Sequence, residues 1–360
     1  MNTLLLLLLS FASLLYAGCA GGPAPLPGIR LDLLRWPSAP TPPKIEWLRE
    51  FRDPRDLGID KGFWTRIAEF VSGEEQTGIV RPYGLFADDH GRIYVADPGA
   101  GVMHLYDTER RRSVRLKGSD EHPLRVPIGI AGDGSTTVYL TDSASGIVFR
   151  HVAGDALLRP FITKGLERPT GIVCDPVRGR LYLSDTTRQQ IVVFDLAGKE
   201  LFRIGSRGAK PGEFNYPTDL CLDRQGRLVV TDSLNFRIQI FAPDGRFIAM
   251  FGQAGNRAGY LAKPKGVAVD SEGHYYSADA LHDAVQIFDV TGRLLLTFGV
   301  RGTRPGEFWM PSGLFIDNRD TVYVADTYNH RIQVFRYRRD AANPSIKSDP
   351  LPGAKAGSAS

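Results

Sequence analysis

Short apolar runs alternate along most of the chain with turns rich in Asp, Gly and Pro. The runs are mainly β-branched and aromatic, as in 322–324 and 228–230, which favours strands over helices. The turns between them carry Gly beside a polar residue, for example Gln225-Gly226, as tight hairpins require. The pattern therefore predicts an all-β protein made of short antiparallel strands.

Six segments of the chain repeat one pattern: a Pro, an apolar strand ending in Asp, a turn, a second strand ending in Asp, and an alternating third strand. The first strands end at Asp88, Asp133, Asp175, Asp223, Asp270 and Asp317. The second strands end at Asp97, Asp142, Asp185, Asp232, Asp279 and Asp326. Fourth strands follow, as in 247–251. Four strands recurring about every 40–50 residues predict a six-bladed β-propeller of four-stranded antiparallel blades.

Two of these segments carry a further signature, Asp326-Thr-Tyr-Asn-His-Arg-Ile-Gln-Val-Phe335 and Asp232-Ser-Leu-Asn-Phe-Arg-Ile-Gln-Ile-Phe241. Together with the inter-blade pieces 208–214 and 302–308, they resemble the NHL repeat. The resemblance covers about residues 81–337 and is weaker in the first two repeats, which lack the Asn-x-Arg-Ile element. It implies a six-bladed propeller that acts as a binding platform.

Closure of the ring needs a strand from the N-terminal side, because no apolar fourth strand follows Arg338. We expect Arg66–Val71 to complete the sixth blade, since it stands where a fourth strand precedes every other blade. The segment Ile45–Phe51 also looks like a strand. It could pack outside that blade or be the closing strand itself.

The N-terminus resembles that of a bacterial lipoprotein. Residues 1–18 form a signal peptide with an apolar stretch too short to span a bilayer, and Ala17-Gly18-Cys19 resembles a lipobox in which Cys19 is lipidated. Tyr16 and an n-region without Lys or Arg depart from the usual pattern. A plain secretory peptide, with Cys19 incidental, is the alternative. The resemblance implies a cell-envelope protein held by lipid, at the outer membrane and facing the periplasm.

The remaining chain divides by composition. Residues 19–43 are rich in Pro, Gly and Ala and predict a tether, 44–340 the propeller, and 341–360 a disordered tail. The net charge of +4 and the scattered basic runs argue against a nucleic-acid partner. Cys174 and Cys221 occupy strand positions of opposite parity, so we expect no disulfide between them.

The polar residues predict no catalytic or metal centre. We expect the twelve recurrent Asp residues to cap turns through the backbone. The seven histidines are scattered, and a zinc site needs three or four converging ligands. His282 and His330 alone, in adjacent blades, could meet a common ligand. No cofactor is predicted; calcium or zinc would fit the family but has no support in these residues.

The mouth of the central channel is the expected ligand site. Residues after the Pro that opens each repeat should surround it. Asp219 stands out there, because the other five repeats have Gly at its position. A carboxylate there, near Lys265, could anchor a polar ligand group, and the alternative is a local salt bridge or a solvated loop. The candidate ligand-binding residues are Tyr83, Thr170, Thr218, Asp219, Lys265, Ser312, His282 and His330.

Three classes of function fit this fold. The first is a lipid-anchored binding protein that recognises a protein, peptide or glycan in the cell envelope. The second is a lyase or lactonase-like enzyme with a metal at the channel, although no ligand set of such enzymes maps onto these entry positions. The third is RNA binding, which an export signal disfavours. We expect the first.

Overall fold

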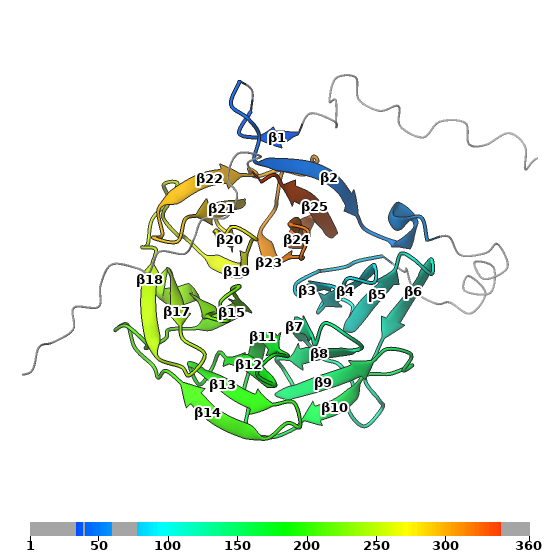
Figure 1. Cartoon of the computed structure of the whole chain (residues 1–360). Helices are drawn as coiled ribbons and strands as arrows, with labels where there is room; N and C mark the ends of the chain where they lie inside the picture. Colours follow the sequence, from blue (N-terminus) through cyan, green and yellow to red (C-terminus); the bar gives the residue numbers. More distant parts are fainter. Residues whose placement is uncertain (1–33, 39, 60–77, 340–360) are drawn as a thin grey trace, which may run out of the picture. The chain divides into compact units, whose positions relative to one another are not determined.

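Figure 1 shows the computed structural model of the chain, which describes residues 34–38, 40–59 and 78–339. The chain divides into two compact units, 1–33 and 34–360, and the described residues belong to the second. Their strands form six antiparallel sheets arranged as blades of a ring. The predicted all-β six-bladed propeller is therefore confirmed.

Each of the first five blades has four strands in simple up-and-down order. Blades 1 and 2 consist of β3 (Leu85–Ala87), β4 (Arg92–Asp97), β5 (Val102–Asp107), β6 (Arg112–Leu116), β7 (Pro127–Gly132), β8 (Thr137–Asp142), β9 (Ile147–Val152) and β10 (Arg159–Ile162). Blades 3 to 5 consist of β11 (Pro169–Asp175), β12 (Arg180–Asp185), β13 (Gln190–Asp195), β14 (Glu200–Ile204), β15 (Pro217–Leu222), β16 (Leu228–Asp232), β17 (Arg237–Phe241), β18 (Phe247–Phe251), β19 (Pro264–Val269), β20 (Tyr275–Asp279), β21 (Ala284–Phe288) and β22 (Leu294–Phe298). The first strand of each blade is innermost.

Blade 6 combines the two ends of the described chain. Its strands are β23 (Pro311–Ile316), β24 (Thr321–Asp326), β25 (Arg331–Tyr337), β2 (Ile45–Phe51) and β1 (Arg35–Trp36). Two short 3-10 turns, Ser233–Asn235 and Thr327–Asn329, join second to third strands in blades 4 and 6. A third, Pro54–Leu57, follows β2.

The recurrent Asp residues are turn caps, as predicted. Asp223 at the end of β15 accepts the backbone N–H groups of Gln225 and Arg227, each at 2.9 Å, and its counterparts in the other blades act in the same way. Asp97 at the end of β4 accepts from the backbone of Val80 and Arg81 at 2.7 and 2.8 Å. The second set thus ties each second strand to the segment that enters the same blade.

Ring closure is made by Ile45–Phe51, not by Arg66–Val71. β2 pairs antiparallel with β25, with Ile45 opposite Tyr337 and Phe51 opposite Ile332, so the place beside β25 is taken. Figure 1 shows β2, in blue, lying along β25. The expectation for Arg66–Val71 was wrong, and that segment lies outside the described residues. Ile45–Phe51 was the alternative that the sequence left open.

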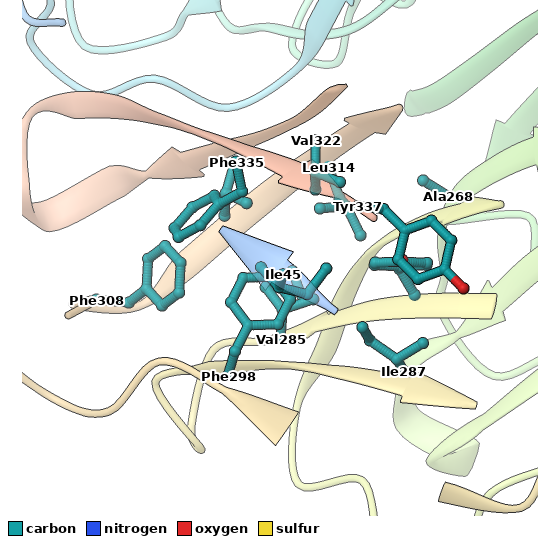
Figure 2. Packing of buried hydrophobic residues seen from close by; sticks show 13 residues of the cluster. Ile45, Ala268, Val285, Ile287, Phe298, Phe308, Leu314, Val322, Phe335 and Tyr337 are labelled. Atoms are coloured by element: carbon teal, nitrogen blue, oxygen red, sulfur yellow. The ribbon is translucent and has the colours of Figure 1, made fainter. Parts of the chain in front are cut away.

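Hydrophobic burial explains why β2 occupies this place. Ile45 is fully buried among Phe298, Phe335 and Val285 between blades 5 and 6, as Figure 2 shows. At its other end, Phe51 is fully buried and meets Tyr106 of blade 1 edge-on, with ring centroids 5.6 Å apart. One strand therefore contributes to the cores on both sides of blade 6.

The strand β1 lies within residues 19–43, which the sequence assigned to a tether. Arg35 and Trp36 pair with Glu46 and Ile45. The Trp36 ring lies 5.8 Å from that of Phe298 and 5.9 Å from that of Phe335. This part of the segment is packed on the propeller. No helix among the described residues is long and apolar enough to span a bilayer.

The role of β2 can be tested with two substitutions on the same strand. Phe51→Ala removes a fully buried ring and should lower the free energy of unfolding by about 3–5 kcal/mol. Leu48→Ala, at a site where the side chain is 37% exposed, should lower it by less than about 1 kcal/mol. Urea titration followed by intrinsic fluorescence measures both. Equal stability of the Phe51→Ala variant and the wild type would show that β2 does not close the ring.

Candidate functional site: the mouth of the central channel

The six innermost strands enclose a cavity of about 360 Å³ along the central channel. Its wall is mostly apolar, with Leu85, Ile172 and Leu314 among the lining residues. Tyr83, Thr218 and Asp219 line it where the innermost strands begin. Asp88 and Asn318 line it beyond the ends of β3 and β23. The cavity therefore runs between two chemically different rims.

The rim at the start of the innermost strands belongs to one face of the ring, which we call the entry face. It consists of the segments that lead into each innermost strand and the loops from second to third strands. Backbone hydrogen bonds join the two sets, as from Thr186 to Arg168 and from Ala280 to Lys263, both at 3.0 Å. The opposite face carries the turns from first to second strands, and we call it the turn face.

Three of the predicted site residues bind the neighbouring blade. The Thr170 hydroxyl donates to the backbone oxygen of Thr218 at 2.9 Å, and that of Thr218 donates to Lys265 at 3.2 Å. The Ser312 hydroxyl contacts Pro82 of blade 1 and Thr327. All three side chains are buried. Their hydroxyls form hydrogen bonds between adjacent blades and are therefore not free to bind a ligand.

Asp219 occupies a crowded position between blades 4 and 5. A Cβ at the equivalent Gly313 would collide with the backbone oxygen of Tyr83, so glycine lets adjacent innermost strands approach closely. In blade 4 the Asp219 carboxylate instead accepts the backbone N–H of Val267 in β19 at 3.1 Å. No ion pair joins Asp219 to Lys265, although both are described. Asp219 therefore does not form the local salt bridge that was one predicted alternative.

The surroundings of Asp219 make its carboxyl group a weaker acid than that of an exposed aspartate. Burial raises the pKa of Asp219 to about 7, against the hydrogen bonds from the backbone of Val267 and Leu220. Tyr83, from blade 1 on the opposite side of the ring, is affected as well: burial and the Asp219 carboxylate both raise its pKa. Tyr83 and Asp219 both line the cavity.

Lys265 lies among cations. Burial lowers its pKa, and the charges of Lys263 and Arg168 lower it further. Arg168 also lies over the ring of Tyr216, with its guanidinium carbon 5.8 Å from the ring centroid. Among the described residues, none of the three cations has a carboxylate within ion-pair distance. The mouth therefore holds uncompensated positive charge.

The carboxylates of the entry face in blades 3 to 6 are already engaged. Glu213 accepts the backbone N–H of Lys210 at 3.0 Å, and Glu307 binds Arg304. Glu167 lies 3.5 Å from Arg188, and Asp283 accepts the backbone N–H of Met310 at 2.7 Å. The positive charge at the mouth is therefore not offset by free acidic groups beside it.

His282 and His330 do not share a common target. His282 Nδ1 lies 3.3 Å from Gln286 and 3.4 Å from Asp279, both within blade 5. His330 Nδ1 contacts the backbone oxygen of Val80 in blade 1. His282 thus contacts only groups of its own blade, whereas His330 links blade 6 to blade 1. Within the described ranges, no group of three or more His, Cys, Asp or Glu side chains could hold a metal ion.

Comparison with protein families finds the NHL repeat at residues 214–241 and 308–335. These stretches contain the inter-blade Phe214 and Phe308 and the Arg-Ile-Gln elements of β17 and β25. The chain is a six-bladed β-propeller that contains NHL repeats at these two stretches. Cys174 and Cys221 of this propeller are both free thiols, as predicted.

Solved structures share the fold of this NHL propeller at low sequence identity. A putative phosphatase from Bacteroides thetaiotaomicron has a TM-score of 0.60 and 16% identity over 82% of this chain and 79% of its own. An auxiliary nutrient binding protein from the same organism gives 0.58 and 16%, over 73% and 71%. Virginiamycin B lyase from Staphylococcus aureus gives 0.55 and 13%, over 82% and 100%.

Sequence analysis missed part of the cationic mouth. Arg168, Tyr216 and Lys263 directly precede the Pro that opens blades 3, 4 and 5, whereas the entry residues proposed as ligand contacts all follow that Pro. The signal was present, because basic and aromatic side chains recur at this position. Their role becomes apparent only when the structure shows that Arg168 and Lys263 have no carboxylate within ion-pair distance among the described residues.

The pKa of Asp219 predicts a pH-dependent effect of Asp219→Asn on stability. The folded protein keeps the Asp219 proton up to about pH 7, whereas the unfolded chain loses it near 3.8. Between these values unfolding releases a proton, so the wild type loses stability as the pH rises. Asparagine avoids this loss. The gain in free energy of unfolding should therefore grow from pH 4 to 7 and reach about 1–3 kcal/mol.

Urea titrations of the wild type and variant at several pH values measure this gain. Asp244→Asn, at an exposed turn of the same blade, controls for the loss of a surface carboxylate. A gain for Asp219→Asn that is the same at pH 4 and pH 8 would contradict the buried, protonated state of Asp219.

Proposed function

We propose that this NHL propeller is a lipid-anchored ligand-binding protein of the cell envelope, which recognises a protein, peptide or glycan with its entry face. The observation that carries the proposal is the set of cations at the mouth, Arg168, Lys263 and Lys265, without carboxylate partners among the described residues. Lys265 is next to the cavity, since its backbone oxygen accepts the hydroxyl of Thr218, which lines the cavity.

Energetics support binding over a purely structural role. Partial burial of Lys265 beside two like charges disfavours its charged form, and nothing in the described fold compensates this cost. Groups held in such an unfavourable environment are concentrated at functional sites. A ligand with an anionic group would supply the missing counter-charge and gain charge-assisted hydrogen bonds.

The shared fold is consistent with this role. One of the similar structures is described as an auxiliary nutrient binding protein, and at 16% identity the likeness concerns the fold alone. The proposal for this chain therefore rests on its own residues.

A second candidate, a propeller enzyme, is favoured by one observation. Asp219 has a pKa of about 7 and lines the cavity near Tyr83, as a general acid or base would. Calcium or zinc would be the metal of this alternative. Stoichiometric metal in the purified protein, lost in the Asp219→Asn variant, would favour the enzyme.

The lipid anchor rests on the sequence, because Cys19 lies outside the described residues. Cys19→Ser should move the protein from the membrane fraction to the soluble fraction of cells. Cys221→Ser, which alters a thiol within the propeller, should leave it in the membrane fraction. Fractionation with immunodetection measures both, and mass spectrometry of the N-terminal peptide identifies the lipid. Retention of the Cys19→Ser variant in membranes would show that lipid on Cys19 is not the anchor.

Recognition by the entry face is tested by affinity capture from envelope extracts with the full chain. The double substitution Arg168→Gln and Lys265→Gln removes two cations from the mouth, and we expect at least roughly tenfold less captured ligand because charged hydrogen bonds are lost. Arg224→Gln removes an exposed cation from the turn face and should change nothing. Equal capture by all three proteins would place recognition elsewhere.

A further inference from the structure

An arc of exposed apolar side chains lies on the entry face in blades 4 to 6 and blade 1. Leu234, Leu281 and Tyr328 occupy the same place in their repeats, the second position after the Asp that ends the second strand. Trp309 lies beside Tyr328, with ring centroids 5.7 Å apart, and Val80 lies at the start of blade 1. The five side chains are between 40% and 59% exposed. We call them the apolar arc.

The equivalent positions in the other three blades are small or polar. Gly99, Ala144 and Thr187 follow the second-strand Asp of blades 1, 2 and 3 at the same distance. Exposed large apolar groups are unfavourable on a surface unless something covers them. Their concentration on one side of one face distinguishes the arc from isolated exposed residues.

The apolar arc and the cationic mouth are neighbours in the fold. Ala280, next to Leu281, donates its backbone N–H to Lys263 at 3.0 Å. Leu234 donates its backbone N–H to Asn215, which precedes the Tyr216 that stacks under Arg168. A bound partner would therefore meet apolar side chains and cations at the same loops.

We propose that the entry face docks an acidic polypeptide segment, with a carboxylate on Lys265 and Arg168 at the mouth and apolar side chains on the arc. This rests on the proposed function and names its ligand class. Charge complementarity selects the acidic partner, because the acidic groups of this face nearest the arc, Glu213, Asp283 and Glu307, already accept hydrogen bonds within the propeller.

Three observations favour a polypeptide over other anionic partners. Leu234, Leu281 and Val80 are aliphatic and match apolar side chains, whereas RNA bases and sugars require exposed aromatic faces. The two aromatic rings of the arc, Trp309 and Tyr328, lie against each other. Lys265 is half-buried, so the carboxylate of a flexible side chain can reach it and a flat membrane surface cannot.

The probe is a fluorescent synthetic peptide of three Glu-Leu-Glu-Phe repeats, titrated with the full chain and followed by anisotropy. We expect saturable binding that weakens as salt is raised. Replacing every Glu of the peptide by Gln should raise Kd at least roughly tenfold, and replacing every Leu and Phe by Ser should do the same, because both parts of the surface contribute.

Substitutions in the protein locate the peptide. Lys265→Gln should raise Kd roughly tenfold and Leu281→Ser roughly three- to tenfold. Val177→Ser, which changes an 89% exposed residue of the turn face, and Arg224→Gln on the same face are the matched controls and should stay within about twofold of the wild type. Lys265→Glu should bind a peptide of Lys-Leu-Lys-Phe repeats better than the wild type does, which shows that the variant is folded.

The outcomes separate this inference from the proposed function. If the peptide does not bind, or binds equally to the Lys265→Gln and Leu281→Ser variants, the acidic-polypeptide inference is wrong even where capture from extracts still depends on Arg168 and Lys265. Tighter binding of single-stranded oligouridine or of phosphatidylglycerol vesicles than of the peptide, lost in the same variants, would also overturn it. If capture from extracts does not depend on Arg168 and Lys265, the proposed function itself is wrong.

Discussion

The buried aspartate at the end of each second strand is the contact on which the entry face depends. In blade 4, Asp232 binds the Asn235 amide, the Arg237 guanidinium and the Gln239 amide at 2.8, 2.8 and 3.1 Å. Arg237 in turn donates to three backbone oxygens of the loop that leads into the blade. Three carbonyls of that loop are thereby satisfied without a strand partner, which helps to hold the loop over the blade in one conformation.

The same network closes the ring in blade 6. Arg331 is fully buried and binds Asp326 at 2.7 Å, three carbonyls of the entry loop, and Glu50 of β2 at 2.6 Å. Trp47 of β2 donates to Gln333 at 3.0 Å. Removing one partner from such a buried network costs about 3–5 kcal/mol, because it leaves the others unpaired. The repeat signature and the closing strand are thus parts of one structural unit.

Much of the fold was predictable because its determinants are local. Every second strand ends at the predicted Asp, and β18 has the predicted limits 247–251, since turn residues and apolar alternation mark them in the sequence. The closing strand was not determined in this way. Both Ile45–Phe51 and Arg66–Val71 are apolar enough for a strand, and the choice depends on long-range contacts of Ile45, Phe51 and Glu50 with blades 5, 1 and 6.

The sequence predicted where the candidate site lies but not which of its residues are available to a ligand. The length of each entry side chain decides which groups it can reach. Thr170, Thr218 and Ser312 are short, and their hydroxyls bind nearby backbone oxygens and hydroxyls of the propeller. Tyr83 is longer and lines the cavity, and Lys265 has no carboxylate partner among the described residues. A sequence pattern shows that six equivalent positions surround the channel, but neighbouring carbonyl groups determine which side chains remain available to a ligand.

The loops between second and third strands show where the repeats are free to differ. In blade 6 the hydroxyl of Thr327 binds Pro82, the Asn329 amide binds Gly302 and Asp326, and Arg331 binds the entry loop. Tyr328 is the one position between Thr327 and Asn329, and its exposed ring takes no part in that network. Substitution of Tyr328 would spare these hydrogen bonds, and an apolar residue at this position in three successive blades fits the partner proposed for the entry face.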